Sequence, residues 1–251
     1  MKNKHIAMWA CPRSRSTAVT RAFEQLDRCI IYDEPLIGAF MVQRGLYPQE
    51  EINKFCETDY KKVIQHITGE LPDNKLFSFQ KHMAIQALPE FGRGWLKLLN
   101  NFFLIRHPKE IILSRFKILN SIEEVYNSPV GLKELSSLYD EIEELTGEKP
   151  LVIHSNDIVK NPQATLQYLC DQLNIVFSEK MLNWDSKPKE TKLSWIENTP
   201  FSGWYSQAIN SSMFIKPKST NLIEIPDNLI PILDECMPFY ERLLQKSVVF
   251  N

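Results

Sequence analysis

The chain has 251 residues, of which 43% are hydrophobic and 24% charged, and its 29 Lys and Arg residues nearly balance its 31 Asp and Glu residues. This length can bury a core without disulfides or metals. The net charge of −2 excludes the broad basic field that nucleic acids require, so no nucleic-acid partner is expected and any anion site must be local.

Short apolar runs alternate with amphipathic stretches along most of the chain. Apolar runs bounded by turn residues indicate buried strands, and stretches with a helical period indicate helices. The expected strands are 6–10, 29–33, 75–79, 101–105 and 150–154, and the expected helices are 17–27, 50–68, 108–126, 131–146, 162–173 and 227–245.

This alternation predicts an α/β fold with one central, mostly parallel sheet flanked by helices. No linker or internal repeat divides the sequence, so residues 1–251 are expected to form one domain with its core at about 6–176. The segment 184–220 is irregular and rich in aromatic residues. It is expected either to form a lid over a substrate or to pack its rings onto the sheet.

Targeting and metal signals are weak. The apolar run that follows Lys2 and Lys4 is too short for a signal peptide or a membrane span. The five cysteines are odd in number and lack C-x-x-C spacing, which favours a reducing compartment, and no H-x-x-x-H pair indicates a metal site. We therefore expect a cytoplasmic protein with no membrane partner and no metal.

The loop "PRSRST" at 12–17 follows the first expected strand and opens the first expected helix. A helix N-terminus offers free amide groups and a positive dipole end, so a P-loop-like strand, loop and helix predicts a phosphate or sulfate site. The loop adds two cations and three hydroxyls, from Arg13, Ser14, Arg15, Ser16 and Thr17. Only Thr17 fits the Walker pattern of nucleotide kinases, which disfavours ATP or GTP hydrolysis.

A second anion motif, "RHPKEIILS", follows the strand 101–105. Arg106 ends the strand, Pro108 is well placed to open a helix, and Ser114 lies within its first turns. Ligands of parallel sheets bind at the carboxyl ends of the strands, so Arg106 and the first loop are expected at the same edge.

The two motifs together resemble those of sulfotransferases that use 3′-phosphoadenosine 5′-phosphosulfate (PAPS), and the chain is similar to small soluble bacterial-type members. A third stretch at 152–175 resembles a further segment of that family, so the resemblance covers about 6–176. It implies PAPS as donor, 3′-phosphoadenosine 5′-phosphate (PAP) as product, and no metal.

The resemblance also implies roles for particular residues. Arg13 to Thr17 would hold the 5′-phosphosulfate, Arg106 and Ser114 would hold the 3′-phosphate, and Arg13 would also neutralise charge during transfer. Arg15 stands where many members have glycine, so its backbone is not expected to take a positive φ freely. His107 replaces the usual Asn or Asp and is expected to affect only the helix cap.

Transfer to an acceptor needs a base within hydrogen-bond reach. Two candidates follow strands, Glu34 after 29–33 and His82 after 75–79, and we expect one of them to be structural. Lys81 resembles the family lysine that contacts the sulfonate, but Lys81 and His82 can reach one site only if the strand has already turned. If Glu34 faces the site, Asp33 is expected to point the other way.

Trp204 and Tyr205 are the expected substrate-side residues in the aromatic segment. The predicted reaction moves a sulfuryl group from PAPS to a hydroxyl or amine of a small molecule. Two alternatives stay open, an atypical P-loop nucleotide kinase and a non-catalytic sensor that binds PAP. The sequence does not give the acceptor or the oligomeric state.

Overall fold

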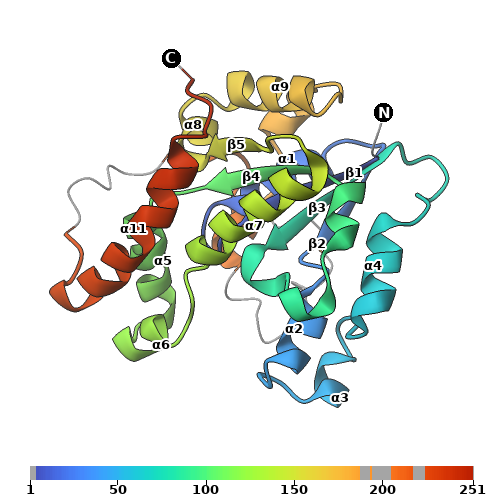
Figure 1. Ribbon diagram of the computed structural model, residues 1–251. Helices are drawn as coiled ribbons and strands as arrows, with labels where there is room; N and C mark the ends of the chain where they lie inside the picture. The colour runs from blue at the N-terminus through green and yellow to red at the C-terminus, as the bar shows by residue number, and fades with distance from the viewer. Residues whose placement is uncertain (1–3, 187–192, 194–204, 217–223, 251) are drawn as a thin grey trace.

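A five-stranded sheet forms the centre of the computed structural model, which describes residues 4–186, 193, 205–216 and 224–250 (Figure 1). The strand order is β2-β3-β1-β4-β5, and all four strand pairings are parallel. The fold class expected from the alternation of strands and helices is confirmed. The strands are β1 (His5–Ala10), β2 (Cys29–Asp33), β3 (Phe77–Met83), β4 (Asn100–Ile105) and β5 (Leu151–His154).

Helices connect the strands and cover both faces of the sheet, as parallel crossovers require. The α-helices are α1 (Ser16–Glu24), α2 (Ile37–Gln43), α3 (Gln49–Ile52), α4 (Tyr60–Thr68), α5 (Pro108–Leu119), α6 (Ile122–Tyr126), α7 (Leu132–Thr146), α8 (Ser155–Lys160), α9 (Pro162–Gln172), α10 (Ser206–Ile209) and α11 (Ile230–Leu244). Short 3-10 turns, such as η1 (Ala84–Gln86) and η3 (Gly94–Leu98), lie among them.

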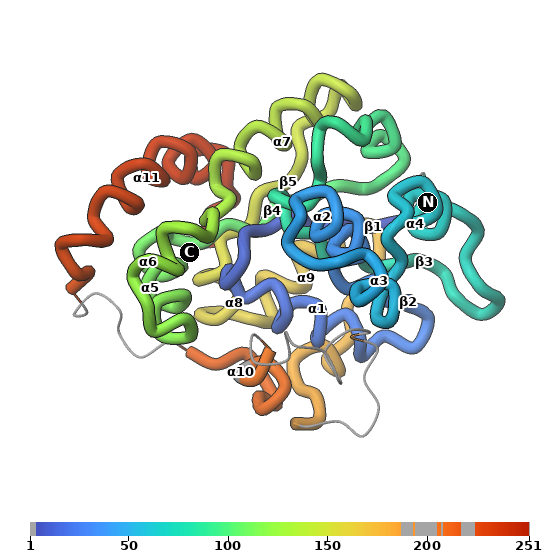
Figure 2. The backbone as a smooth tube through the Cα atoms, turned by 90° about the horizontal axis from the view of Figure 1, so that it is seen from below, coloured from blue at the N-terminus to red at the C-terminus, as the bar shows by residue number. Residues whose placement is uncertain are grey.

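The hydrophobic core has two parts, one on each face of the sheet. Met8 and Phe79 point to the face that α1, α8 and α9 cover, and Trp9 and Phe103 point to the face that α4, α5, α7 and α11 cover. Figure 2 shows α7 and α11 on one side of the sheet and α1 and α10 on the other. Successive residues of each strand are therefore buried in opposite layers, which explains why the strands read as unbroken apolar runs.

Local signals break two expected helices. The helix expected at 50–68 is two helices, α3 and α4, and Asp59 caps α4 by accepting hydrogen bonds from the amides of Lys61 and Lys62. The helix expected at 108–126 ends at Asn120, which takes φ +52°, and Ser121 caps the following helix. Short polar side chains that accept from backbone amides begin a new helix, and an asparagine in the left-handed region ends the previous one.

The strand order places three chain segments at one edge. β1 lies between β3 and β4, and the chain leaves β1 toward β2 but later crosses to β4 on the other side. Such a change of direction marks the ligand-binding edge of parallel sheets. The carboxyl ends of β1, β3 and β4 therefore bring 12–15, Lys81 and Arg106 to the same edge.

Within the described ranges, no helix has the length and apolar character to cross a bilayer. The two longest, α7 and α11, have 15 residues each, whereas a span takes about 20.

Candidate active site

The loop after β1 turns sharply around the N-terminus of α1. Arg13 and Arg15 take φ values of +67° and +69°, in the left-handed region. Arg15 therefore adopts the positive φ that its side chain was expected to resist, at a cost of about 1–2 kcal/mol. α1 begins at Ser16, one residue before the expected start, and Arg15 is its N-cap. Ser14 is fully buried, and its Oγ has no hydrogen-bond partner among the described residues.

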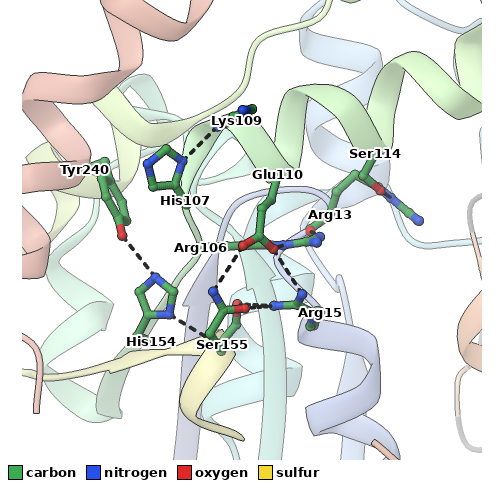
Figure 3. Close-up of polar contacts among 11 residues, drawn as sticks. Arg13, Arg15, Arg106, His107, Lys109, Glu110, Ser114, His154, Ser155 and Tyr240 are labelled. Carbon is green, nitrogen blue, oxygen red and sulfur yellow. Dashed lines mark hydrogen bonds and ion pairs between the residues drawn. The ribbon is translucent and has the colours of Figure 1, made fainter. Parts of the chain in front are cut away.

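The two anion motifs meet at the ends of β1 and β4 (Figure 3). Arg106 Nη1 donates to the carbonyl oxygen of Arg13 at 2.6 Å, and Arg13 Nε donates to Ser114 Oγ at 3.1 Å. Burial lowers the pKa of Arg13, and the charge of Arg106 lowers it further. The structure thus brings together Arg13, Arg106 and Ser114, and the like charges of the two arginines favour an anion beside them.

Glu110 of α5 links both arginine-bearing segments. Its Oε2 accepts from Arg106 Nε at 2.8 Å and from Arg15 Nη2 at 3.0 Å, while Oε1 accepts from Asn156 Nδ2 at 3.1 Å. Burial raises the pKa of Glu110, but the Asn156 bond and the Arg106 charge outweigh it and the net pKa is lowered. Arg15 also donates to Asn156 Oδ1 at 2.6 Å and to Ser155 Oγ at 3.1 Å. Glu110 therefore stays ionised and fixes both guanidinium groups.

A buried cluster surrounds Lys81 at the end of β3. Its Nζ lies 2.6 Å from Asp33 Oδ1, 3.0 Å from Glu34 Oε1, 3.1 Å from Tyr205 Oη and 3.3 Å from Thr17 Oγ1. Burial lowers the pKa of Lys81, but the charges of Asp33 and Glu34 outweigh it, and the net pKa is raised. The cluster thus holds a protonated ammonium between the loop after β1 and two carboxylates.

The expectation that Asp33 points away from Glu34 is wrong. Asp33 pairs with Lys81 across β2 and β3, and paired residues project from the same face. Glu34 comes next but takes φ +48°, so the chain has left the strand and both carboxylates contact the same ammonium.

Comparison with known proteins decides the family. Residues 4–247 match the family described as sulfotransferase domain. The chain belongs to this sulfotransferase family. Two Arabidopsis thaliana proteins, named branched-chain-amino-acid aminotransferase-like protein 2 and 1, are 32% and 30% identical to it over 244 residues. The match covers 95% of this chain and 41% of each relative, so the chain spans about two fifths of their length.

Solved sulfotransferases share the fold. The sulfotransferase domain from the curacin biosynthetic pathway superposes with a TM-score of 0.55 at 14% identity, covering 94% of this chain and 98% of that one. The sulfotransferase from Alicyclobacillus acidocaldarius gives a TM-score of 0.53 at 11% identity, covering 99% and 98%.

In this sulfotransferase domain, Glu34 is the candidate base that lies in the cluster. Its Oε1 accepts from Tyr205 Oη at 2.8 Å, and its Oε2 accepts from Gln86 Nε2 at 2.7 Å. Burial raises the pKa of Tyr205 well above the usual range, and the nearby carboxylates raise it further. A neutral phenol therefore sits against Glu34 and Lys81.

The structure does not bring His82 to this cluster. β3 has not turned at this point, so Lys81 and His82 project from opposite faces of the same strand. The His82 ring is fully buried and stacks on Trp9 at 4.4 Å, and its Nε2 donates to Gln80 Oε1 at 3.0 Å. Burial lowers the pKa of His82 to about 3, so this ring is neutral.

A cavity of about 410 Å³ lies beside the arginine network, between α5, α8 and α11. His107 and His154 cap α5 and α8, accepting from the amides of Lys109 and Asn156 through Nδ1. The expected cap role of His107 is confirmed. His154 Nε2 lies 3.0 Å from Tyr240 Oη, and both rings line the cavity.

Sequence reasoning missed Glu110, Ser155, Asn156 and Gln86. Glu110 alone carried a signal, because it follows Arg106 by four residues where the helix was expected. Trp204 lies outside the described residues, as does much of 184–220, while Tyr205 lies in the cluster. Across the described ranges, no group of three or more His, Cys, Asp or Glu side chains is placed to hold a metal ion.

Proposed function

We propose that this domain transfers a sulfuryl group from PAPS to a hydroxyl or amine of a small molecule and releases PAP. The observation that carries the proposal is the meeting of Arg13 with Arg106 and Ser114, which joins two anion motifs at one sheet edge. A nucleotide with phosphates at both its 5′ and 3′ positions matches two such neighbouring motifs.

The residues present fit the donor. The buried Ser14 hydroxyl lacks a partner among the described residues, and buried polar groups usually have one. The residues Arg13 to Thr17 would hold the 5′-phosphosulfate. Helix α1 begins at Ser16, so its free backbone amides would point toward this group. Arg106 and Ser114 would hold the 3′-phosphate, and Glu110 would keep the Arg106 side chain oriented.

PAPS supplies a sulfuryl group on a good leaving phosphate. Arg13 and Lys81 place fixed positive charge where negative charge develops, which a preorganised site does without reorganisation. Lys81 bridges Thr17 of the loop and Glu34, at 3.3 and 3.0 Å. Glu34 would take the acceptor proton, because it lies in the cluster whereas His82 lies on the other face of β3.

The proposal also covers the acceptor class, the cellular compartment and the domain organisation. The acceptor is a small molecule, no nucleic acid takes part, and the protein acts in the cytoplasm without a membrane partner. Residues 1–251 would form one sulfotransferase domain with its core at 6–176, and Tyr205, in the described part of 184–220, lies against the proposed centre. The near-neutral net charge of −2 supports the exclusion of polyanionic acceptors.

Calorimetric titration with PAP, beside ADP plus magnesium, tests the proposal without knowledge of the acceptor. We expect PAP to bind far more tightly than ADP, because only PAP carries a 3′-phosphate for Arg106. Binding of ADP with magnesium and not of PAP would favour a kinase and overturn the proposal. PAP binding without transfer of labelled sulfate to any acceptor in a metabolite screen would favour a PAP sensor.

A further inference from the structure

Tyr205 contacts both the proposed base and the lysine of the proposed transfer centre. Its Oη donates to Glu34 Oε1 at 2.8 Å and accepts from Lys81 Nζ at 3.1 Å. The same ammonium lies 4.6 Å from the centre of the Tyr205 ring and 3.3 Å from Thr17 Oγ1. The phenol is therefore bonded to the proposed base. The Lys81 ammonium lies between it and Thr17, in the loop that would hold the phosphosulfate.

This geometry is the one that an acceptor needs. An acceptor oxygen must donate its proton to the base and lie beside the cations that stabilise the sulfuryl group during transfer. Tyr205 meets both conditions and is only 4% exposed, so no separate acceptor oxygen fits beside Glu34 and Lys81 while it is there.

The way Tyr205 is attached allows it to leave. It is the N-cap residue of α10, a helix of four residues, whereas the buried Tyr139 and Tyr240 belong to helices of 15 residues. A residue at the end of one short helix can move without unfolding a long element.

We propose that Tyr205 fills the acceptor position of its own chain, and that an aryl hydroxyl replaces it in the reaction; this rests on the proposed sulfuryl transfer. An aryl ring fits because the Lys81 ammonium also lies near the ring of the occupant, a contact that favours aromatic rings over saturated ones. In the step, the acceptor O–H proton passes to Glu34. The acceptor oxygen bonds to sulfur as the bond from sulfur to the 5′-phosphate oxygen breaks, and PAP leaves.

Substitution of Tyr205 by glycine tests the proposal, since the side chain removed has the shape of p-cresol, and an engineered cavity can bind a small aromatic molecule that fits it. We expect Tyr205→Gly to sulfate p-cresol with labelled PAPS about 100-fold faster than the unchanged protein. Adding Glu34→Gln should remove about 100-fold of that rate, as loss of a positioned base does. Tyr205→Phe keeps the ring in place and should therefore gain much less of this rate than Tyr205→Gly.

4-Methylcyclohexanol has nearly the shape of p-cresol but a saturated ring. Its sulfation by Tyr205→Gly should be at least about tenfold slower, because a saturated ring lacks the cation–π contact and the acidic phenol proton. Equal rates for the two alcohols would overturn the assignment of an aryl acceptor.

Calorimetry separates the two proposals. If Tyr205→Gly melts cooperatively and binds PAP as the unchanged protein does, yet leaves p-cresol unsulfated, Tyr205 has only a structural role and this inference falls alone. If PAP binds neither protein, the proposed function itself falls.

A second measurement uses the unchanged sequence in case Tyr205→Gly does not fold. Protein labelled with 3-fluorotyrosine is saturated with PAP, and the Tyr205 fluorine resonance is assigned by its loss in Tyr205→Phe. Adding p-cresol should then shift that resonance as the side chain is displaced. A resonance that stays in place up to saturating p-cresol would overturn the proposal.

Discussion

Arg106→Ala separates the two phosphate positions that we assign. The side chain is 12% exposed, donates to the Arg13 carbonyl at 2.6 Å and to Glu110 at 2.8 Å, and would contact only the 3′-phosphate of a nucleotide. A charged hydrogen-bond pair to phosphate is worth about 3 kcal/mol, so loss of this contact alone should lower PAP affinity about 100-fold. Loss of the bond to the Arg13 carbonyl costs about 1 kcal/mol, or about fivefold, for any ligand of the loop.

Calorimetric titration with PAP and with adenosine 5′-phosphosulfate, at one fixed salt concentration, measures both terms. The second ligand lacks a 3′-phosphate and should lose only the smaller factor. Lys109→Ala is the matched control, because it removes a charge three residues away without touching Arg13 or Glu110, and PAP should bind it almost unchanged. Equal losses for the two ligands, or equal losses in the two variants, would refute the assignment of Arg106.

Three further predictions concern stability, measured by urea unfolding. Lys81→Met leaves the buried Asp33 and Glu34 without their cation and should cost about 3–5 kcal/mol, and adding Asp33→Asn should recover part of it; no recovery would contradict the pairing. Arg15→Gly should be about 1 kcal/mol more stable than Arg15→Ala, because both lose the side chain but only glycine takes φ +69° freely; the reverse order would contradict this. The folded pKa of His82 is about 3 and its unfolded pKa about 6.5. Between these two pH values the unfolded chain binds a proton that the folded chain does not, so stability is lost as pH falls from about 6.5 toward 3. Relative to His82→Phe, the unchanged protein should therefore lose about 2 kcal/mol between pH 7 and pH 5, and a constant difference would contradict it.

The sheet could be predicted because parallel strands covered on both faces must be apolar, as at 6–10 and 101–105. β3 was expected to end at 79 but continues to Met83, through Gln80, Lys81 and His82. Polar residues normally end a buried strand, yet each of these finds a partner from elsewhere in the chain: the Ile67 carbonyl for Gln80, Asp33 for Lys81 and the Trp9 ring for His82. Such long-range partners leave no local pattern.

The same limit applies to the site. Arg13, Arg106 and Ser114 could be placed together because strand ends share an edge, whatever the details of the loops. Ser155 and Asn156 could not be placed in the site. They begin the six-residue helix α8 directly after β5, whereas the sequence predicted a loop between the strand 150–154 and the helix 162–173. Their contacts with Arg15 depend on how α8 lies against the loop after β1, which no short stretch of sequence encodes.

Backbone strain marks the candidate site independently of its side chains. Among the described non-glycine residues with positive φ, three are asparagines, which tolerate that region, and the other three are Arg13, Arg15 and Glu34. Each strained residue costs about 1–3 kcal/mol, a large part of the 5–15 kcal/mol by which a domain is typically stable. Glycine would fold into these turns at lower cost but would lose the guanidinium and carboxylate groups. The strained turns therefore place the two guanidinium groups and the carboxylate at the ends of β1 and β2, at a cost in stability. Such strain is expected where a turn positions groups for binding or reaction.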